Sequence, residues 1–156
     1  MKIEVGNIAP DFILTDTEKK KVTLSDQKGS TVLLLFFPLA FTGVCTKELC
    51  SIRDNIAAYN KANAIVFGIS VDAPQTLAKF KAEQNLNFSL LSDFNKEASA
   101  AYGAQYDLFA GWMRGVSKRS AFVIDKDGLV QYAEVLENAG ELPNFEAIQE
   151  TLKKLS

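Results

Sequence analysis

Two cysteines, Cys45 and Cys50, are the side chains in this sequence that are best suited to covalent chemistry. The chain of 156 residues contains no histidine. This absence excludes a Ser-His-Asp triad, a cysteine–histidine protease pair and every metal site built on histidine. Two thiolates alone make a poor zinc site, and their spacing is not Cys-x-x-Cys. The two cysteines therefore indicate thiol redox chemistry or simple burial rather than a permanent structural disulfide.

The residues before Cys45 predict that its thiol lies at a helix N-terminus. Pro38 ends an apolar run and Thr42 is a preferred N-cap residue, so Cys45 is expected in the first helical turn. A thiolate there lies near the positive end of the helix dipole and near unpaired N–H groups. The dipole contributes only about 0.3–1 kcal/mol, which is too little to ionise most of a thiol at neutral pH. A fixed cation is also needed.

Arg119 is the candidate for that cation. It opens an apolar strand expected at residues 121–124, which could bring it beside the Cys45 loop. An arginine stays charged, and its rigid fork of donors can hold a thiolate and a substrate oxygen together. Charge on the leaving group must be stabilised as well, and Arg119, the Thr42 hydroxyl and the N–H groups near Cys45 are the available donors. The alternative for Arg119 is a surface ion pair.

The apolar pattern predicts strands that alternate with helices. Residues 32–37 and 64–71 are continuous apolar runs, typical of buried strands, and the right-handed crossover rule makes them parallel neighbours. Functional loops then lie at the carboxyl ends of these strands, where Cys45 follows the first of them. The other expected strands are 12–15, 21–24, 88–91, 121–124 and 130–135; the expected helices are 44–62, a helix capped by Asp72 that reaches Gln84, 98–102 and 145–155. We expect one α/β domain, 1–156, with a central mixed sheet flanked by helices on both faces.

Composition and charge limit the classes of binding partner and the cellular location that we expect for this chain. The net charge is −2, and no basic stripe could follow a phosphate backbone, so we expect no nucleic-acid partner. The longest apolar run is too short to cross a bilayer, so we expect no membrane association. The first residues carry charge and no apolar leader, which makes a cytoplasmic location the default expectation.

The motifs and their order resemble those of the peroxiredoxin family. The pattern Pro38-x-x-x-Thr42-x-x-Cys45 resembles the family's active-site motif, and Arg119 matches the family's arginine. The resemblance covers nearly the whole chain, through Pro10-Asp11-Phe12, Ile69-Ser70-Val71-Asp72, Leu90-Leu91-Ser92-Asp93 and Tyr102-Gly103. The sequence around Cys45 and the region 112–119 look most like those of the alkyl hydroperoxide reductase E branch. The position of Cys50 instead looks like the resolving position of the Q-type branch, also called bacterioferritin comigratory protein.

The resemblance implies a fold and a role for each motif residue. The fold would be thioredoxin-like, and Cys45 would be the peroxidatic cysteine, which attacks a hydroperoxide and becomes a sulfenic acid. Pro38 would shield that intermediate, Thr42 would hydrogen-bond the peroxide, and Arg119 would stabilise the thiolate and the transition state. Glu48, three residues after the cysteine, would orient Arg119; its alternative is an acid on the helix surface. The resemblance requires no metal, haem or flavin.

Cys50 raises a geometric question. Five residues along a helix rise ~7.5 Å and turn about 140° away. A disulfide needs Cα atoms within roughly 7 Å and facing Cβ atoms, so Cys45 and Cys50 cannot bond inside an intact helix. If Cys50 resolves the sulfenic acid, the first turns must unwind in each cycle, and this is our hypothesis. The alternative is a buried helix residue without a redox role.

The implied partners are a hydroperoxide substrate and a thioredoxin-like or glutaredoxin-like reductant. The apolar stretch from Phe109 to Met113, which includes Trp112, is a core patch or an exposed contact. As an exposed contact it would serve a homodimer or the rim of a peroxide pocket. One alternative function is a one-cysteine peroxidase resolved by an external thiol, and another is a non-catalytic redox sensor or holdase. A dithiol–disulfide oxidoreductase acting on proteins is disfavoured by the missing Cys-x-x-Cys motif.

Overall fold

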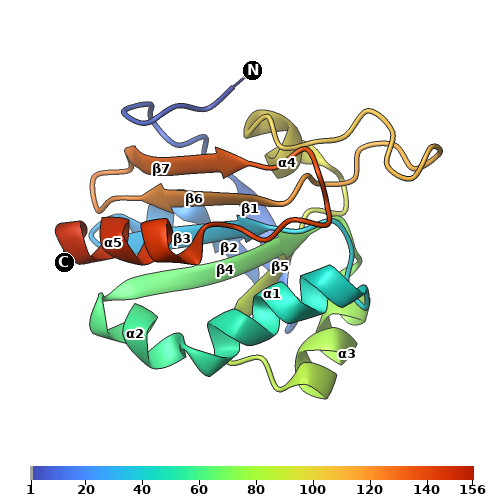
Figure 1. Ribbon diagram of the computed structural model, residues 1–156, viewed down its shortest axis with the longest axis horizontal. Coiled ribbons are helices and arrows are strands. Elements are labelled where there is room, and N and C mark those ends of the chain that lie inside the picture. Colours follow the sequence, from blue (N-terminus) through green and yellow to red (C-terminus); the bar gives the residue numbers. More distant parts are fainter. Residues whose placement is uncertain (1) are drawn as a thin grey trace.

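A central β-sheet organises the chain. The computed structural model describes residues 2–156. The strands are β1 (Ile13–Asp16), β2 (Lys21–Thr23), β3 (Thr31–Phe36), β4 (Ala64–Ser70), β5 (Ser89–Ser92), β6 (Ser120–Ile124) and β7 (Val130–Val135). Within the described residues they form one seven-stranded sheet in the order β2-β1-β5-β4-β3-β6-β7 (Figure 1).

The middle of the sheet is mixed, as the sequence predicts. β3 and β4 pair in parallel, with Thr31 opposite Ala64 and Phe36 opposite Ile69. β6 then pairs antiparallel to β3 on its other side. The expected parallel pair is therefore confirmed, and the strand that follows Arg119 lies directly beside the strand that leads to Cys45.

Helices cover both faces of this sheet, which confirms the expected α/β class. One face packs against α1 (Gly43–Asp54), α2 (Ile56–Lys61), α3 (Pro74–Gln84) and α5 (Phe145–Leu155). The other face is covered by the N-terminal segment, a 3₁₀ turn (Leu24–Gln27) and α4 (Glu97–Ala101). In Figure 1, α1, α2 and α5 lie on the same side of β3 and β4.

The helix expected over 44–62 is wrong as a single element. It is divided at Asn55, whose φ of −114° and ψ of 16° are not helical. The Asn55 side chain donates to the Ser51 carbonyl at 2.8 Å, so it ends α1 by competing for a backbone acceptor. The region that contains both cysteines is thus an independent helix.

The cap expected at Asp72 is also wrong. Ala73 precedes α3 with extended backbone angles, as a residue before Pro74 should. The Asp72 carboxylate instead accepts from the Ser70 hydroxyl at 2.7 Å and from the Ala40 amide at 2.8 Å. Asp72 therefore ties the end of β4 to the loop after β3.

Most other elements begin or end within two residues of the expected bounds, and α5 matches them fully. The strand expected at 21–24 ends earlier because Leu24 begins the 3₁₀ turn.

Among residues 2–156, no helix combines the length and apolar character needed to cross a membrane.

Gly68, in the middle of β4, leaves space for the side chains of Leu90 and Phe37 to pack against the strand. A Cβ atom there would lie 2.7 Å from Leu90 Cδ2 and 3.5 Å from Phe37 Cε1. Both neighbours are fully buried, so neither can move aside freely. We expect Gly68→Ala to lower the free energy of unfolding in urea by about 1–3 kcal/mol. Gly43→Ala is the control, since its Cβ meets nothing within 4 Å; equal stability of the two variants would contradict this packing.

Candidate active site

The loop between β3 and α1 delivers the candidate nucleophile. Phe37 continues the strand, with its amide donating to the Ile69 carbonyl at 2.9 Å, and Pro38 is buried directly after it. The bond from the Ala40 amide to Asp72 then fixes the turn. Phe41 takes a left-handed φ of 65°, which turns the chain toward the start of α1.

Cys45 lies in the first turn of α1, as the sequence predicts. Thr42 is the N-cap residue, and the first helical hydrogen bond runs from the Thr46 amide to the Thr42 carbonyl at 3.0 Å. The amides of residues 43–45 consequently have no helical acceptor. The Cys45 side chain is 1% exposed and belongs to the apolar cluster under α1. The thiol is therefore held in a water-poor site at the positive end of a helix.

Thr42 does not cap the helix with its side chain. Thr42 occupies the predicted N-cap position, but its hydroxyl donates to the Leu39 carbonyl at 2.7 Å and makes no cap hydrogen bond. The threonine is exposed, whereas Cys45 is buried. Thr42 thus lies at the surface next to the buried thiol, with its proton already committed to the loop.

A buried arginine joins the elements at this site. Arg119 Nη2 lies 3.4 Å from Cys45 Sγ, and Nη1 donates to Glu48 Oε1 at 2.7 Å. Nη2 also donates to the Ala139 carbonyl at 2.8 Å, in the loop between β7 and α5. The Arg119 side chain is 1% exposed and that of Glu48 is fully buried. The structure thus brings these distant sequence positions together, and it rules out the surface alternatives for both Arg119 and Glu48.

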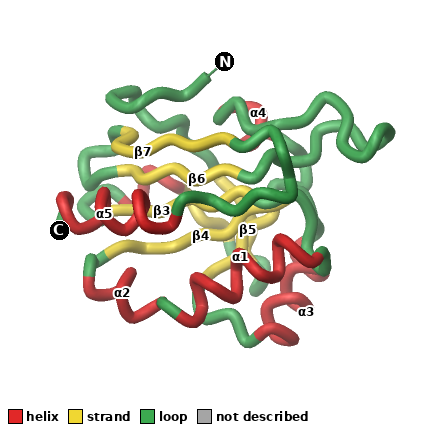
Figure 2. Tube along the Cα trace, viewed as in Figure 1, coloured by secondary structure: helices red, strands yellow, loops and turns green. Residues whose placement is uncertain are grey.

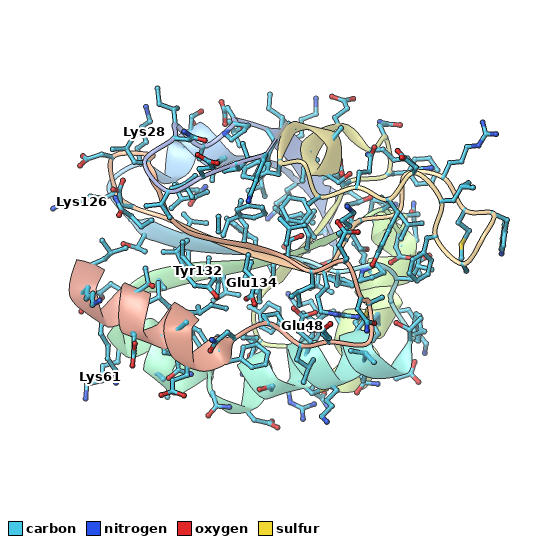
Figure 3. The ribbon with its side chains drawn as sticks, turned by 45° about the horizontal axis from the view of Figure 1, so that its top comes forward. Lys28, Glu48, Lys61, Lys126, Tyr132 and Glu134 are labelled. Atoms are coloured by element: carbon cyan, nitrogen blue, oxygen red, sulfur yellow. The ribbon has the colours of Figure 1, made fainter. Side chains whose placement is uncertain are left out.

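Glu48 has unusual electrostatics. Its pKa is raised to about 7, chiefly by burial and also by the nearby Glu134, while the cation of Arg119 acts in the opposite direction. Its second oxygen, Oε2, is buried without a hydrogen-bond partner among the described residues. In Figure 3, Glu48, Glu134 and Tyr132 lie on one side of the sheet, between β7 and α1. The carboxyl group is therefore balanced between its two protonation states near neutral pH.

Arg119 keeps its charge in this setting. Burial disfavours the guanidinium ion, but Glu48 and Cys45 outweigh that effect, so the pKa of Arg119 lies above its ordinary value. A permanent cation is thus held against the sulfur of Cys45, where it favours the thiolate. The resulting site combines a nucleophilic sulfur, a fixed positive charge and free amide donors.

Cys50 lies in the same regular helix as Cys45, and both thiols are free. Its side chain is half-buried on the other side of α1, with Sγ 3.5 Å from Gln84 Oε1. The two cysteines therefore do not meet in this conformation, as helix geometry requires.

The apolar stretch near Trp112 is exposed rather than part of the core. It forms an arm with paired positions at Gln105–Ser117 and Phe109–Met113, which projects from the sheet (Figures 1 and 2). Trp112 at its tip is 73% exposed. A surface hollow between the arm and the Cys45 loop is lined by Leu39, Val71, Phe94, Trp112, Met113 and Val116. Lys96 and Arg114 also line it, so this hollow combines apolar surface with two cationic side chains.

Two supporting residues escape prediction from the sequence. Ala139 contributes only a carbonyl oxygen, which no residue type reveals. Asp72 supports the loop instead of capping a helix, although it stands in the stretch Ile69-Ser70-Val71-Asp72 that carries the family resemblance.

Among residues 2–156, no group of three or more His, Cys, Asp or Glu side chains is placed to hold a metal ion.

Comparison with known proteins gives one consistent family. The AhpC/TSA family model matches residues 5–133. The chain is 37% identical over 131 residues to peroxiredoxin Bcp of Escherichia coli K12, covering 83% of this chain and 84% of that protein. It is 38% identical over 136 residues to alkyl hydroperoxide reductase E of Mycobacterium bovis, covering 85% and 86%. Its structure matches peroxidoxin BcpB from Mycobacterium tuberculosis with a TM-score of 0.87 and 29% identity, covering 99% of both chains.

The raised pKa of Glu48 predicts a specific pH dependence of stability. The folded chain favours the protonated carboxyl, so Glu48 adds stability below its ordinary pKa of 4.5, and this is lost as pH rises through about 7. Relative to Glu48→Gln, the wild-type free energy of unfolding should fall by on the order of 2–3 kcal/mol across that window. Urea titrations at several pH values, followed by fluorescence, measure the difference. A difference that stays constant with pH would contradict the prediction.

Proposed function

Because this chain belongs to the AhpC/TSA family of peroxiredoxin-type enzymes, we propose that Cys45 is its peroxidatic cysteine, acting on hydrogen peroxide and organic hydroperoxides. One observation carries the proposal: the buried guanidinium of Arg119 lies 3.4 Å from Cys45 Sγ at the start of a helix. A buried cation beside a thiol favours the thiolate, which is the nucleophile in cysteine chemistry.

The reaction step is consistent with these positions. The Cys45 thiolate attacks the terminal oxygen of the hydroperoxide; an S–O bond forms, the O–O bond breaks, and the leaving alkoxide or hydroxide takes up a proton. Cys45 is oxidised to a sulfenic acid and the peroxide is reduced to an alcohol or water. Arg119 and the free amides of residues 43–45 supply donors for the negative charge on the oxygens.

Thr42 and Pro38 have complementary roles in this proposal. The Thr42 hydroxyl gives its proton to the Leu39 carbonyl, so its oxygen is available to accept from the O–H of a hydroperoxide. This role reverses the donor role expected from the sequence. Pro38 is buried at the end of β3 and has no N–H, so it excludes water from the sulfur without offering a competing donor.

Glu48 acts through Arg119 in this scheme. Its Oε1 accepts from Nη1 at 2.7 Å, while Ala139 accepts from Nη2. Both contacts restrict the Arg119 guanidinium to one orientation, in which Nη2 faces the sulfur of Cys45. Glu48 is therefore proposed as a positioning residue rather than a proton carrier.

The second half of the proposed cycle uses Cys50. Its thiolate attacks the Cys45 sulfenic acid, releases water and leaves an intrachain disulfide, which a thioredoxin-like or glutaredoxin-like protein reduces. The continuous helix from Gly43 to Asp54 means that α1 must partly unwind first. The same observation also favours a one-cysteine cycle completed by an external thiol, and the mass of the oxidised protein separates the two.

The apolar surface near the site supports organic hydroperoxides as substrates. Trp112 and Met113 face the Cys45 loop across a shared hollow, where an alkyl chain would lose contact with water.

Replacing Arg119 should slow the first step strongly. We expect Arg119→Gln to reduce the second-order rate of Cys45 oxidation about 10²–10³-fold, since it removes the charge that stabilises the transition state. Arg119→Lys should be intermediate, because lysine keeps the charge but cannot hold Glu48 and the sulfur with one rigid fork. Stopped-flow fluorescence with hydrogen peroxide measures the rate. Lys61→Gln, an exposed cation on α2, is the control, and a wild-type rate for Arg119→Gln would contradict the assignment.

Intact mass after a few seconds with one equivalent of hydrogen peroxide tests the cysteine roles. Wild-type protein should lose two hydrogens and give no adduct with a sulfenic-acid trap. Cys50→Ser should give a trapped adduct on Cys45, and Cys45→Ser should not react.

Other outcomes separate the alternatives. A trapped adduct in wild-type protein would indicate the one-cysteine cycle. Wild-type thiols that stay reduced would overturn the peroxidase proposal. Oxidation without turnover in the presence of a reductant would indicate a sensor or holdase, and rapid reduction of insulin would indicate a dithiol oxidoreductase.

A further inference from the structure

The half of α1 that contains Cys50 is tied to the end of α3 by three hydrogen bonds. Cys50 Sγ lies 3.5 Å from Gln84 Oε1. Arg53 Nη1 donates to the Gln84 carbonyl at 2.6 Å, and the Asn87 side chain donates to the Arg53 carbonyl at 3.3 Å. Cys50 and Arg53 are three residues apart, so both project from one face of the helix. We call this set of contacts the Gln84 clasp.

We propose that Gln84 is a positioning residue for Cys50: the clasp holds the thiol in a resting position and sets the rate at which it can attack oxidised Cys45. The inference rests on the proposed resolving role of Cys50. Whichever end of α1 unwinds, Cys50 Sγ must leave Gln84 Oε1 before it can reach the other sulfur.

The chemistry of the contact slows attack in a second way. The side-chain oxygen of Gln84 is an acceptor, so Cys50 must donate its S–H proton to it, and this hydrogen bond must break before the sulfur can attack. Only the thiolate attacks a sulfenic sulfur. While the clasp is closed, the Cys50 sulfur is therefore held away from Cys45, with its S–H directed to Gln84.

Arg53 holds the backbone side of the clasp. Asp54 chiefly, and the Cys50 sulfur with it, raise the pKa of Arg53, so this cation persists next to the thiol. Its shortest hydrogen bond goes to the backbone carbonyl of Gln84 rather than to the sulfur.

The step controlled by the clasp is balanced. The Cys50 thiol gives its proton to solvent, and the sulfur attacks Sγ of the Cys45 sulfenic acid. The S–S bond forms, the S–O bond breaks, and the hydroxide that leaves takes up a proton as water. Both sulfurs end in the disulfide, and no outside reductant is needed until that bond is reduced.

The test compares the two phases of one reaction. Reduced full-length protein is mixed with hydrogen peroxide, quenched with acid over a time series and alkylated, and mass spectrometry measures sulfenic acid and disulfide. Gln84→Leu keeps the side-chain bulk and the backbone carbonyl but removes the acceptor. We expect disulfide formation to become about three- to tenfold faster, equivalent to the loss of one hydrogen bond, with Cys45 oxidation unchanged.

Two further variants separate this role from a general loosening of the fold. Gln84→Glu supplies a stronger acceptor, so disulfide formation should slow down and its pH profile should move to higher pH. Asn87→Ala loosens the clasp without touching Cys50 and should give a smaller acceleration. Glu83→Ala, an exposed neighbour on α3, is the matched control.

The outcomes distinguish the clasp from the proposed resolving role. If wild-type protein forms no disulfide, the resolving role of Cys50 fails, and the clasp inference fails with it. If wild-type protein forms the disulfide but Gln84→Leu and Gln84→Glu react at the Glu83→Ala rate with the same pH profile, the clasp alone is overturned. Circular dichroism and an unchanged first phase establish that each variant is folded.

Discussion

The buried guanidinium of Arg119 is the interaction on which the rest of the site depends. An isolated charge in a protein core is strongly unfavourable, and here it is compensated by Glu48, the Ala139 carbonyl and the sulfur of Cys45. These partners come from separate segments, which must all be in place for the charge to be tolerated. The sheet order meets this demand, because β6 brings Arg119 directly beside β3, whose end leads to Cys45.

The carboxyl partner adds a second level of control. Glu48 is fully buried, its pKa is raised to about 7, and its second oxygen lacks a partner among the described residues. When it is ionised it neutralises much of the charge of Arg119, and when it is protonated more of that charge is left for Cys45. The charge balance of the site is therefore coupled to pH near neutrality.

The helix that contains both cysteines has two opposing effects. Its N-terminus places Cys45 next to free amides and a positive dipole end, which suits a thiolate. Its regular geometry keeps Cys50 on another side, held by Gln84. In the proposed cycle, the features that prepare the first step therefore delay the second, and the clasp is the contact that we propose sets that delay.

The sequence by itself determined the class of fold and pointed to Cys45 as a candidate nucleophile that needs a cation beside it. Periodicity and cap residues depend on neighbours in the chain, so the central strands, α5 and the place of Cys45 in its helix were predictable. The position of Arg119 before an apolar strand made it the candidate cation, and the family resemblance supported it and added Glu48. Only the tertiary structure decided that Thr42 donates to Leu39, that Asp72 holds the Ala40 loop, and that Ala139 and Gln84 take part. These contacts join residues far apart in the chain or use backbone atoms, and no residue type or spacing encodes which of the available partners lies within reach after folding.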